Sequence, residues 1–198
     1  MNNEAIFAAY EQIADVYVAQ RDQFKSQRYL ERFAELVPEG SSILDVGCGG
    51  GLPVDGFLID RGYQVHGIDL SSRMIELALA NVPQATYELA NMSELQPSQF
   101  TVGGIVSLYA IFHTPRERHA ELLGTFASFL PSGGAMLISM GASDWEGTDS
   151  FHGVDMSWSH FGSEINLDLV SDAGFAVLHA EIDHSSDESH QFIIAVKL

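Results

Sequence analysis

The sequence is poor in cysteine, in basic residues and in long apolar runs. Cys48 is the single cysteine among 198 residues, which excludes an internal disulfide and a cysteine-based zinc site and suits a reducing cytoplasm. Nine Lys and Arg stand against 27 Asp and Glu, a formal net charge of −18. Nucleic acids and anionic membranes both require clustered cations, so we expect neither as a partner. Apolar runs such as 134–140 have the length of a strand and the first residues lack a basic signal-peptide region, so we expect a cytoplasmic protein.

The apolar residues that are present make up 46% of the chain, enough for the core of one domain over 1–198. Their spacing predicts helices over 3–20 and 24–36, followed by strands that alternate with helices. The expected strands are 42–46, 63–69, 86–90, 104–109 and 135–140, with a final antiparallel hairpin at 175–183 and 190–197. This order predicts an α/β fold, a seven-stranded, mostly parallel sheet with helices on both faces and a helix at 164–173 before the hairpin.

A glycine-rich loop carries the strongest chemical signal. Residues 44–52 read LDVGCGGGL, between an expected strand and a helix that begins near Pro53. Glycines there let a ligand pack directly on the backbone beside the start of the helix. Asp69 ends the next strand, where a carboxylate accepts both hydroxyls of a ribose. Leu52 takes the place of the third glycine of a dinucleotide site and no Lys-Ser/Thr follows, so the loop predicts a nucleoside other than NAD or a triphosphate.

This pattern resembles motif I of the class I S-adenosylmethionine-dependent methyltransferases, including their UbiE-like small-molecule members. Similarity continues at 90–92, where the family places a polar residue beside the adenine, at 104–113, at 130–134 (LPSGG) and at 173–175. The resemblance implies a Rossmann-like methyltransferase with S-adenosylmethionine as cofactor and S-adenosylhomocysteine as product. The cofactor-binding residues that it implies are Asp45, Gly47, Cys48, Gly49, Leu52, Asp69, Leu70, Met74, Asn91, Met92, Leu108 and Tyr109.

The methyl acceptor is expected to be a small molecule. The nucleic-acid enzymes of this family carry an Asp/Asn-Pro-Pro-aromatic motif where this chain has Ser107-Leu-Tyr-Ala110, and no carboxylate at 106–112 offers a metal ligand. The segment 10–17 resembles the family's N-terminal helical cap, which we place at 1–38 ahead of a cofactor-binding core at 39–140. On that resemblance Tyr17 faces the reactive sulfonium, although Tyr10 and Tyr17 are equally well explained as core aromatics. His113 is a candidate base and, alternatively, a residue that only orders its loop.

The stretch 141–161 has neither helical nor strand periodicity, and we expect a loop that forms a lid over the acceptor, ahead of a C-terminal helix and hairpin at 162–198. It contains both tryptophans. The expected acceptor-binding residues are Tyr17, His113, Trp145, His152, Trp158 and His160. No metal is expected, and the other five histidines are given no role, His119 on an exposed helix among them. The alternatives are a non-catalytic S-adenosylmethionine or S-adenosylhomocysteine binder and, less favoured, a nicotinamide-dependent oxidoreductase; the chain is expected to be a monomer or homodimer.

Overall fold

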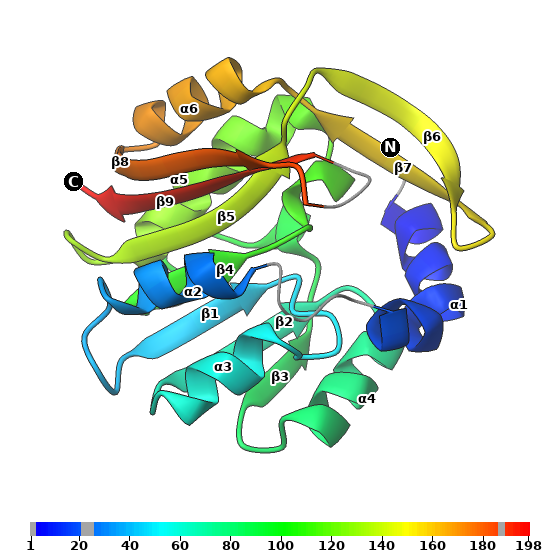
Figure 1. Ribbon diagram of the computed structural model, residues 1–198, viewed down its shortest axis with the longest axis horizontal. Helices are drawn as coiled ribbons and strands as arrows, with labels where there is room; N and C mark the ends of the chain where they lie inside the picture. Colours follow the sequence, from blue (N-terminus) through cyan, green and yellow to red (C-terminus); the bar gives the residue numbers. More distant parts are fainter. Residues whose placement is uncertain (1–2, 21–25, 186–188) are drawn as a thin grey trace.

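A seven-stranded sheet forms the centre of the molecule (Figure 1). The computed structural model describes residues 3–20, 26–185 and 189–198. The strand order is β3-β2-β1-β4-β5-β9-β8, with β1 to β5 parallel and β9 antiparallel to both of its neighbours. The strands are β1 Ser42–Val46, β2 Gln64–Asp69, β3 Thr86–Leu89, β4 Gly104–Ser107, β5 Ala135–Gly141, β8 Phe175–Asp183 and β9 His190–Lys197. The predicted α/β fold is confirmed, including the C-terminal hairpin.

Helices cover both faces of this sheet. One face carries α2 (Gln27–Ala34), α3 (Val54–Asp60) and α4 (Ser72–Asn81), and the other carries α5 (His119–Phe129) and α6 (Ser163–Asp172). Successive residues of β1 point to opposite faces, so Ile43 joins the core under α2 and α3 while Leu44 joins the core under α5. All four residues of β4 are buried, as expected for a central parallel strand. Short 3-10 turns follow β3 and β4: η1 Met92–Glu94, η2 Ile111–His113 and η3 Arg116–Arg118.

Helix α1 (Asn3–Gln20) lies outside these layers and packs against α4 and against β7 (Val154–His160). That 1–38 form a cap stays a prediction. Within this range, helix α2 belongs to the helical layer on the sheet, because Tyr29, Leu30 and Phe33 are buried against the strands. No helix in the described ranges combines the length and apolarity needed to cross a bilayer.

The prediction that residues 141–161 form a loop is wrong. Strands β6 (Trp145–Phe151) and β7 (Val154–His160) form a separate antiparallel hairpin. His152 and Gly153 connect them with φ of 50° and 83°, the left-handed backbone that a two-residue type I′ turn requires. Within β7, Val154, Met156 and Trp158 alternate with polar residues, a period of two that was present in the sequence.

Candidate functional site

A cavity opens at the carboxyl ends of β1, β2 and β4, where the strand order changes direction. This is the edge at which parallel α/β sheets bind ligands. Nine of the twelve residues expected at the cofactor line it, and so do both candidate catalytic residues, Tyr17 and His113. The nine are Gly47, Gly49, Asp69, Leu70, Met74, Asn91, Met92, Leu108 and Tyr109. The sequence interpretation missed Ile6, Tyr10, Ile68, Ala90, Ala110 and Thr114, which also line the cavity.

The glycine loop presents bare backbone to this cavity. Gly47 and Gly49 have φ of 78° and 55°, and a Cβ at Gly47 would lie 2.5 Å from Cβ of Ala110. A side chain would therefore be both strained and obstructed at position 47. The N–H groups of Gly47 and Cys48 donate to the carbonyl of Ile68 at 2.8 and 3.0 Å. Strand β2 thus holds the loop. Because these N–H groups already donate to β2, the role of the glycines is to let a ligand approach the backbone closely.

Asp69 is fixed at the end of β2 by two backbone donors. Gly49 N–H donates to its Oδ2 and Ser71 N–H to its Oδ1, both at 2.9 Å. Burial raises the pKa of Asp69, and these hydrogen bonds oppose that rise. Each carboxylate oxygen has more than one acceptor position, so an oriented carboxylate at the cavity wall suits a ligand with two adjacent hydroxyls.

Asn91 is also held by its neighbours. Its Oδ1 accepts from N–H and Oγ of Ser93, at 3.0 and 2.6 Å, and its Nδ2 donates to Oε1 of Glu94 at 2.9 Å. Both ends of the amide are therefore engaged within η1. Beside it, Met92 gives this end of the cavity an apolar wall suited to a flat ring.

Asp45, Cys48 and Leu52 are not among the lining residues; they lie behind the loop. Leu52 packs in the core under α3, because its side chain occupies the space beside Gly56. Asp45 is buried and hydrogen-bonds with Asp55 of α3. Burial raises the pKa of Asp55 to about 7, partly offset by its hydrogen bonds with Asp45 and Tyr87. Asp55 and Tyr87 support the loop from behind, and the acid in the apolar run VDGFL was the signal for this role.

Tyr10 and His113 form a hydrogen-bonded pair on the cavity wall. Tyr10 Oη lies 2.7 Å from Nε2 of His113, and Nδ1 of the same ring lies 3.0 Å from the carbonyl oxygen of Ser157. A backbone carbonyl only accepts, so Nδ1 carries the ring proton and Nε2 accepts the Tyr10 hydroxyl proton. Burial lowers the pKa of His113 to about 4, so the ring is neutral near pH 7.

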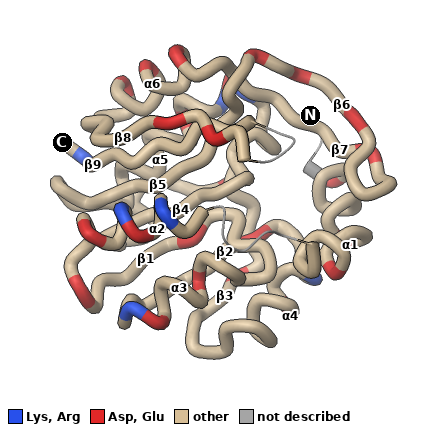
Figure 2. Tube along the Cα trace, viewed as in Figure 1, with Lys and Arg blue, Asp and Glu red and all other residues tan. Residues whose placement is uncertain are grey.

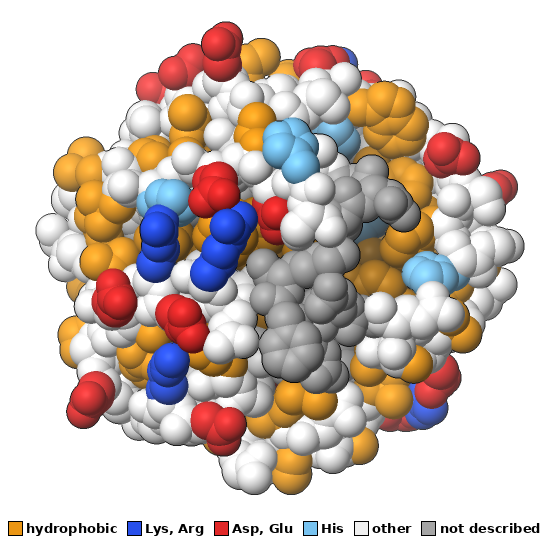
Figure 3. Space-filling view, viewed as in Figure 1, with side chains coloured by type: hydrophobic (Ala, Val, Ile, Leu, Met, Phe, Trp, Pro, Cys, Tyr) orange, Lys and Arg blue, Asp and Glu red, His pale blue; other side chains and the backbone are white. Residues whose placement is uncertain are grey.

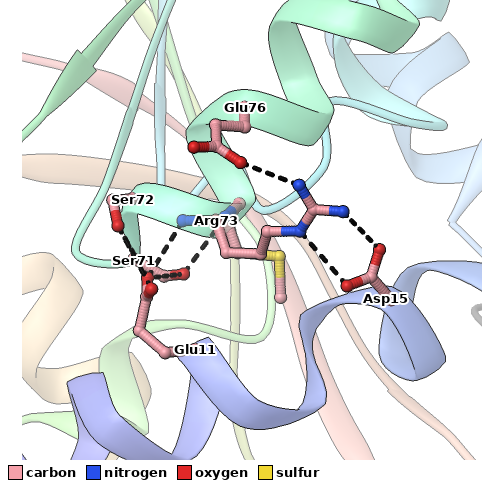
Figure 4. Close-up of polar contacts among 7 residues, drawn as sticks. Glu11, Asp15, Ser71, Ser72, Arg73 and Glu76 are labelled. Carbon is pink, nitrogen blue, oxygen red and sulfur yellow. Dashed lines mark hydrogen bonds and ion pairs between the residues drawn. The ribbon is translucent and has the colours of Figure 1, made fainter.

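Helix α1 is fastened over the cavity by a cluster of polar contacts with the start of α4 (Figure 4). Glu11 accepts from Ser71 Oγ at 2.7 Å and from Arg73 N–H at 2.9 Å, and both of its oxygens lie 3.1 Å from Ser72 Oγ. Asp15 accepts two hydrogen bonds from the Arg73 guanidinium, at 2.7 and 3.1 Å. We call this set of contacts the α1 clasp. It holds the helix whose other faces present Tyr10 and Tyr17 to the cavity.

The six expected acceptor residues do not share one cavity. Tyr17 and His113 line the first, whereas Trp145, Trp158 and His160 line a second cavity beside the β6–β7 hairpin. His152 lines neither; its ring lies 6.3 Å from that of Tyr17. Across the described ranges, no three His, Cys, Asp or Glu side chains gather as a metal site would require.

Comparisons with curated proteins find methyltransferases. The chain is 26% identical over 186 residues to an uncharacterized methyltransferase of Synechocystis sp., covering 89% of this chain and 85% of that protein. It is 32% identical over 107 residues to the ubiquinone biosynthesis O-methyltransferase of Azoarcus sp.. That match covers 50% of this chain and 44% of the relative, so the chain spans less than half of the relative's length.

Solved structures share the fold. The 1,6-didemethyltoxoflavin-N1-methyltransferase of Burkholderia thailandensis, solved with 1,6-didemethyltoxoflavin and S-adenosylhomocysteine, superposes with a TM-score of 0.76 at 17% identity. The match covers 98% of this chain and 86% of that one. Magnesium protoporphyrin IX methyltransferase from Synechocystis, solved with S-adenosylmethionine, gives a TM-score of 0.64 at 20% identity, covering 98% and 83%.

The family assignment comes from a model of the methyltransferase domain, which matches residues 17–180. This range includes the glycine loop, Asp69, the turn after β4 and the β6–β7 hairpin. The chain belongs to the methyltransferase domain family.

Proposed function

We propose that this chain is an S-adenosylmethionine-dependent enzyme that transfers a methyl group to a small molecule. The observation that carries the proposal is the first cavity, where the glycine loop, the fixed carboxylate of Asp69 and the apolar wall at Met92 meet at one sheet edge. These residues fit the cofactor, because the loop leaves no Cβ at Gly47 and the carboxylate suits a ribose. Asp69 would hold the ribose hydroxyls, the backbone at 47–49 would contact the amino-acid part, and Asn91 and Met92 would frame the adenine.

When bound, the cofactor would supply a methyl group on a sulfonium sulfur: the acceptor atom would form a bond to the methyl carbon in line, and the sulfur would leave with the electron pair of the broken bond. The acceptor loses one proton overall. That proton passes to solvent, and residues of the chain need only orient the acceptor and keep water away from the reacting methyl group, so neither a metal nor a covalent enzyme intermediate enters the scheme.

Tyr10 and His113 are our candidates for handling the acceptor. Because the Tyr10 hydroxyl donates its hydrogen bond to His113 Nε2, the Tyr10 oxygen is oriented to accept from an acceptor N–H or O–H. A hydrogen bond of this kind would direct a nucleophile lone pair at the methyl group. Tyr17, in edge contact with Tyr10 at 5.9 Å, would complete this wall.

The relatives support a small acceptor, since their names specify ubiquinone biosynthesis, 1,6-didemethyltoxoflavin and magnesium protoporphyrin IX. The charge of −18 points away from nucleic acid. We place the protein in the cytoplasm, as a monomer or homodimer in which 1–198 act as one domain.

Calorimetric titration with S-adenosylmethionine and S-adenosylhomocysteine tests the cofactor assignment. We expect both to bind the wild type, and Asp69→Ala to weaken each by at least about tenfold, since hydrogen bonds to a charged group contribute about 1.5–3 kcal/mol. Asp69→Asn, which keeps one oxygen for the loop, should lose affinity as well. Asp168→Ala, an exposed acid on α6, is the matched control and should bind normally.

Failure of the folded wild type to bind either compound would refute the proposal. If both Asp69 variants bound the two compounds as tightly as the wild type, the carboxylate would not belong to the site. The unfolding temperature and circular dichroism of each variant show whether the protein is folded.

A further inference from the structure

The second cavity lies between the β6–β7 hairpin and the end of the sheet, and aromatic rings dominate it. The lining comes from η2 after β4, the end of β5 and the residues after it, the two hairpin strands and the start of β9. Its aromatic lining residues are Phe112, Trp145, Phe151, Trp158, His160 and His190. Neighbouring rings meet mostly edge to face. The ring centroids of Trp145 and Trp158 lie 5.9 Å apart, and those of Phe151 and Trp158 lie 5.8 Å apart. These rings are therefore not stacked on one another.

Two glycines leave room for these rings. A Cβ on Gly141, at the end of β5, would overlap the His160 ring, and one on Gly147 would lie 3.1 Å from the Trp145 ring. The His160 ring is fixed as well, because its Nδ1 lies 2.6 Å from the carbonyl oxygen of Ser143 and must donate to it. The rings are thus positioned by local backbone, and Trp145 remains 39% exposed, open to a partner.

The charge around this cavity is acidic. Asp149 is its one lining carboxylate, and no Lys or Arg among the described residues lines it. The nearby acids Asp144 and Glu146 pair with Arg116, at 2.9 and 3.6 Å, which leaves that guanidinium committed to them. Figure 2 shows acidic and no basic positions along β6 and β7. In Figure 3, the Lys and Arg side chains of the visible face gather mainly on the side of α2 and α3.

Ring contacts join the two cavities, measured between ring centroids. Tyr17 of the first lies 6.0 Å from Phe151 of the second, His113 lies 6.0 Å from Trp158, and Tyr109 lies 4.9 Å from His190. The second cavity therefore begins directly behind the wall that faces the cofactor-site residues. At each contact two rings, one from each lining, separate the cavities, and a molecule held in the second would extend past such a pair to present an atom in the first.

We propose that the second cavity binds a planar aromatic ring that carries a positive charge, as the part of the methyl acceptor remote from the reacting atom. The tryptophan and phenylalanine faces attract a cation through their negative π surfaces, Asp149 supplies the counter-charge, and the lack of a lining cation disfavours an anion. The inference rests on the proposed function for its relation to methyl transfer, whereas the binding itself is testable without turnover.

Tryptophan fluorescence reports on this cavity directly, because the chain has two tryptophans and both line it. The probes are benzamidine, benzamide and benzoate, which share one ring and differ in charge, with cyclohexanecarboxamidine as a non-aromatic cation. Each is titrated into the wild type saturated with S-adenosylhomocysteine. We expect benzamidine to change the emission saturably and to bind about two- to fivefold more tightly than benzamide, the range of one exposed cation–π contact. Benzoate and cyclohexanecarboxamidine should bind more weakly than benzamide and benzamidine, respectively.

Variants locate the site. Asp149→Asn should abolish the preference for benzamidine over benzamide, and Trp145→Ala should weaken both. Asp155→Asn, an exposed acid on β7 that does not line the cavity, is the matched control and should retain the preference. Calorimetry of S-adenosylhomocysteine with the same variants should be unchanged.

Benzamide or benzoate binding as tightly as benzamidine would overturn this inference, as would an emission that no probe changes. A loss of the preference in Asp155→Asn as well would also overturn it. If S-adenosylhomocysteine itself fails to bind, the proposed function fails, and the benzamidine titration of the free protein still decides the second cavity.

Discussion

At the scale of single residues, Tyr10 and His113 show how a backbone carbonyl can set the chemistry of a site. The Ser157 carbonyl fixes the proton on Nδ1, which leaves Nε2 to accept a hydrogen bond from the Tyr10 hydroxyl. With its pKa near 4, His113 is a weak base, so its contribution near pH 7 is to orient Tyr10. His113 is therefore a positioning residue in our scheme, and Tyr10 is the group that would touch the acceptor.

Removing the Tyr10 hydroxyl tests this division of roles. We expect Tyr10→Phe to lower kcat about fivefold, since one hydrogen bond contributes about 1 kcal/mol. The affinity for S-adenosylhomocysteine should stay within about twofold, because an aromatic ring still fills the cavity wall. His113→Gln, whose amide oxygen can accept from Tyr10, should retain more activity than His113→Ala. Steady-state kinetics with an acceptor that the enzyme methylates provide kcat for each variant, and inhibition by S-adenosylhomocysteine in the same assay provides its affinity. A Tyr10→Phe enzyme with wild-type kcat would contradict the assignment.

The pH profile separates positioning from a purely structural role. Since the His113 pKa is lowered to about 4, the ring stays neutral from pH 8 down to about pH 5. With an acceptor that does not titrate in that range, kcat of the wild type should be flat and should fall only as His113 is protonated. That acidic limb should be absent from His113→Gln.

At the scale of elements, α1 is a helix with three differently occupied faces. Ile6 and Ile13 pack against Met156 of the hairpin, Tyr10 and Tyr17 face the cavity, and Glu11 and Asp15 reach α4. Burial acts to raise the pKa of Glu11, but the hydrogen bonds at the start of α4 outweigh it and hold that pKa below its ordinary value. The positive end of the α4 dipole adds to this attraction. The clasp therefore holds the helix that closes the cavity.

Weakening the clasp should speed release of the ligand beneath it. We expect Glu11→Gln to raise the dissociation rate of S-adenosylhomocysteine about three- to tenfold, because the amide keeps the shape but loses the charge. Added salt should reduce the difference in dissociation rate between Glu11→Gln and the wild type, because it screens the charge of Glu11. Glu164→Gln, in the first turn of α6, is the matched control because it also removes an acid from a helix start. Stopped-flow displacement measures the rates, and equal release from Glu11→Gln and wild type would show that α1 does not limit exit.

The elements also show where sequence reasoning succeeds. Strands that must bury both faces are largely apolar runs, and glycines before Asp69 mark a ligand edge, so β1, β4, β5 and the first cavity were predictable. The hairpin was missed because β6 mixes Gly, Thr, Asp and Ser and gives no period of its own, which obscured the alternation in β7. Glu11 was unpredictable because its partners lie about 60 residues away on α4.

His190 illustrates a different limit. It follows the turn after β8 and reads as a surface residue, yet β9 returns between β5 and β8 and carries the ring into the second cavity. His119, expected on an exposed helix, is fully buried, with Nε2 3.2 Å from the Thr114 carbonyl oxygen. The positions of both rings depend on how distant segments pack together, which no local sequence pattern encodes.

At the scale of the whole molecule, buried titratable groups make the free energy of unfolding depend on pH in opposing ways. Burial lowers the pKa of both His113 and His119 to about 4, so the unfolded chain binds their protons first and stability falls as the pH drops from about 6.5 to 4. Asp55 acts in the opposite sense, because burial raises its pKa to about 7. Between pH 3.8 and 7 the folded protein keeps the Asp55 proton while the unfolded chain has lost it. The contribution of Asp55 to the free energy of unfolding is therefore complete below pH 3.8 and is lost as the pH rises towards 7. Wild-type stability should therefore be greatest near pH 6.5.

Asp55→Asn isolates the acidic contribution. The amide keeps the shape and still accepts from Tyr87, but it has no proton to lose, so the variant escapes the cost of ionising a buried carboxyl. Its stability should equal that of the wild type near pH 4, exceed it progressively up to pH 7 and then keep a constant advantage of at most about 4 kcal/mol. Urea unfolding at a series of pH values measures this difference, with Asp60→Asn on the exposed end of α3 as the control. An advantage that does not change with pH would mean that Asp55 ionises as readily in the folded protein as in the unfolded chain, and the acid behind the glycine loop would then be solvated rather than buried.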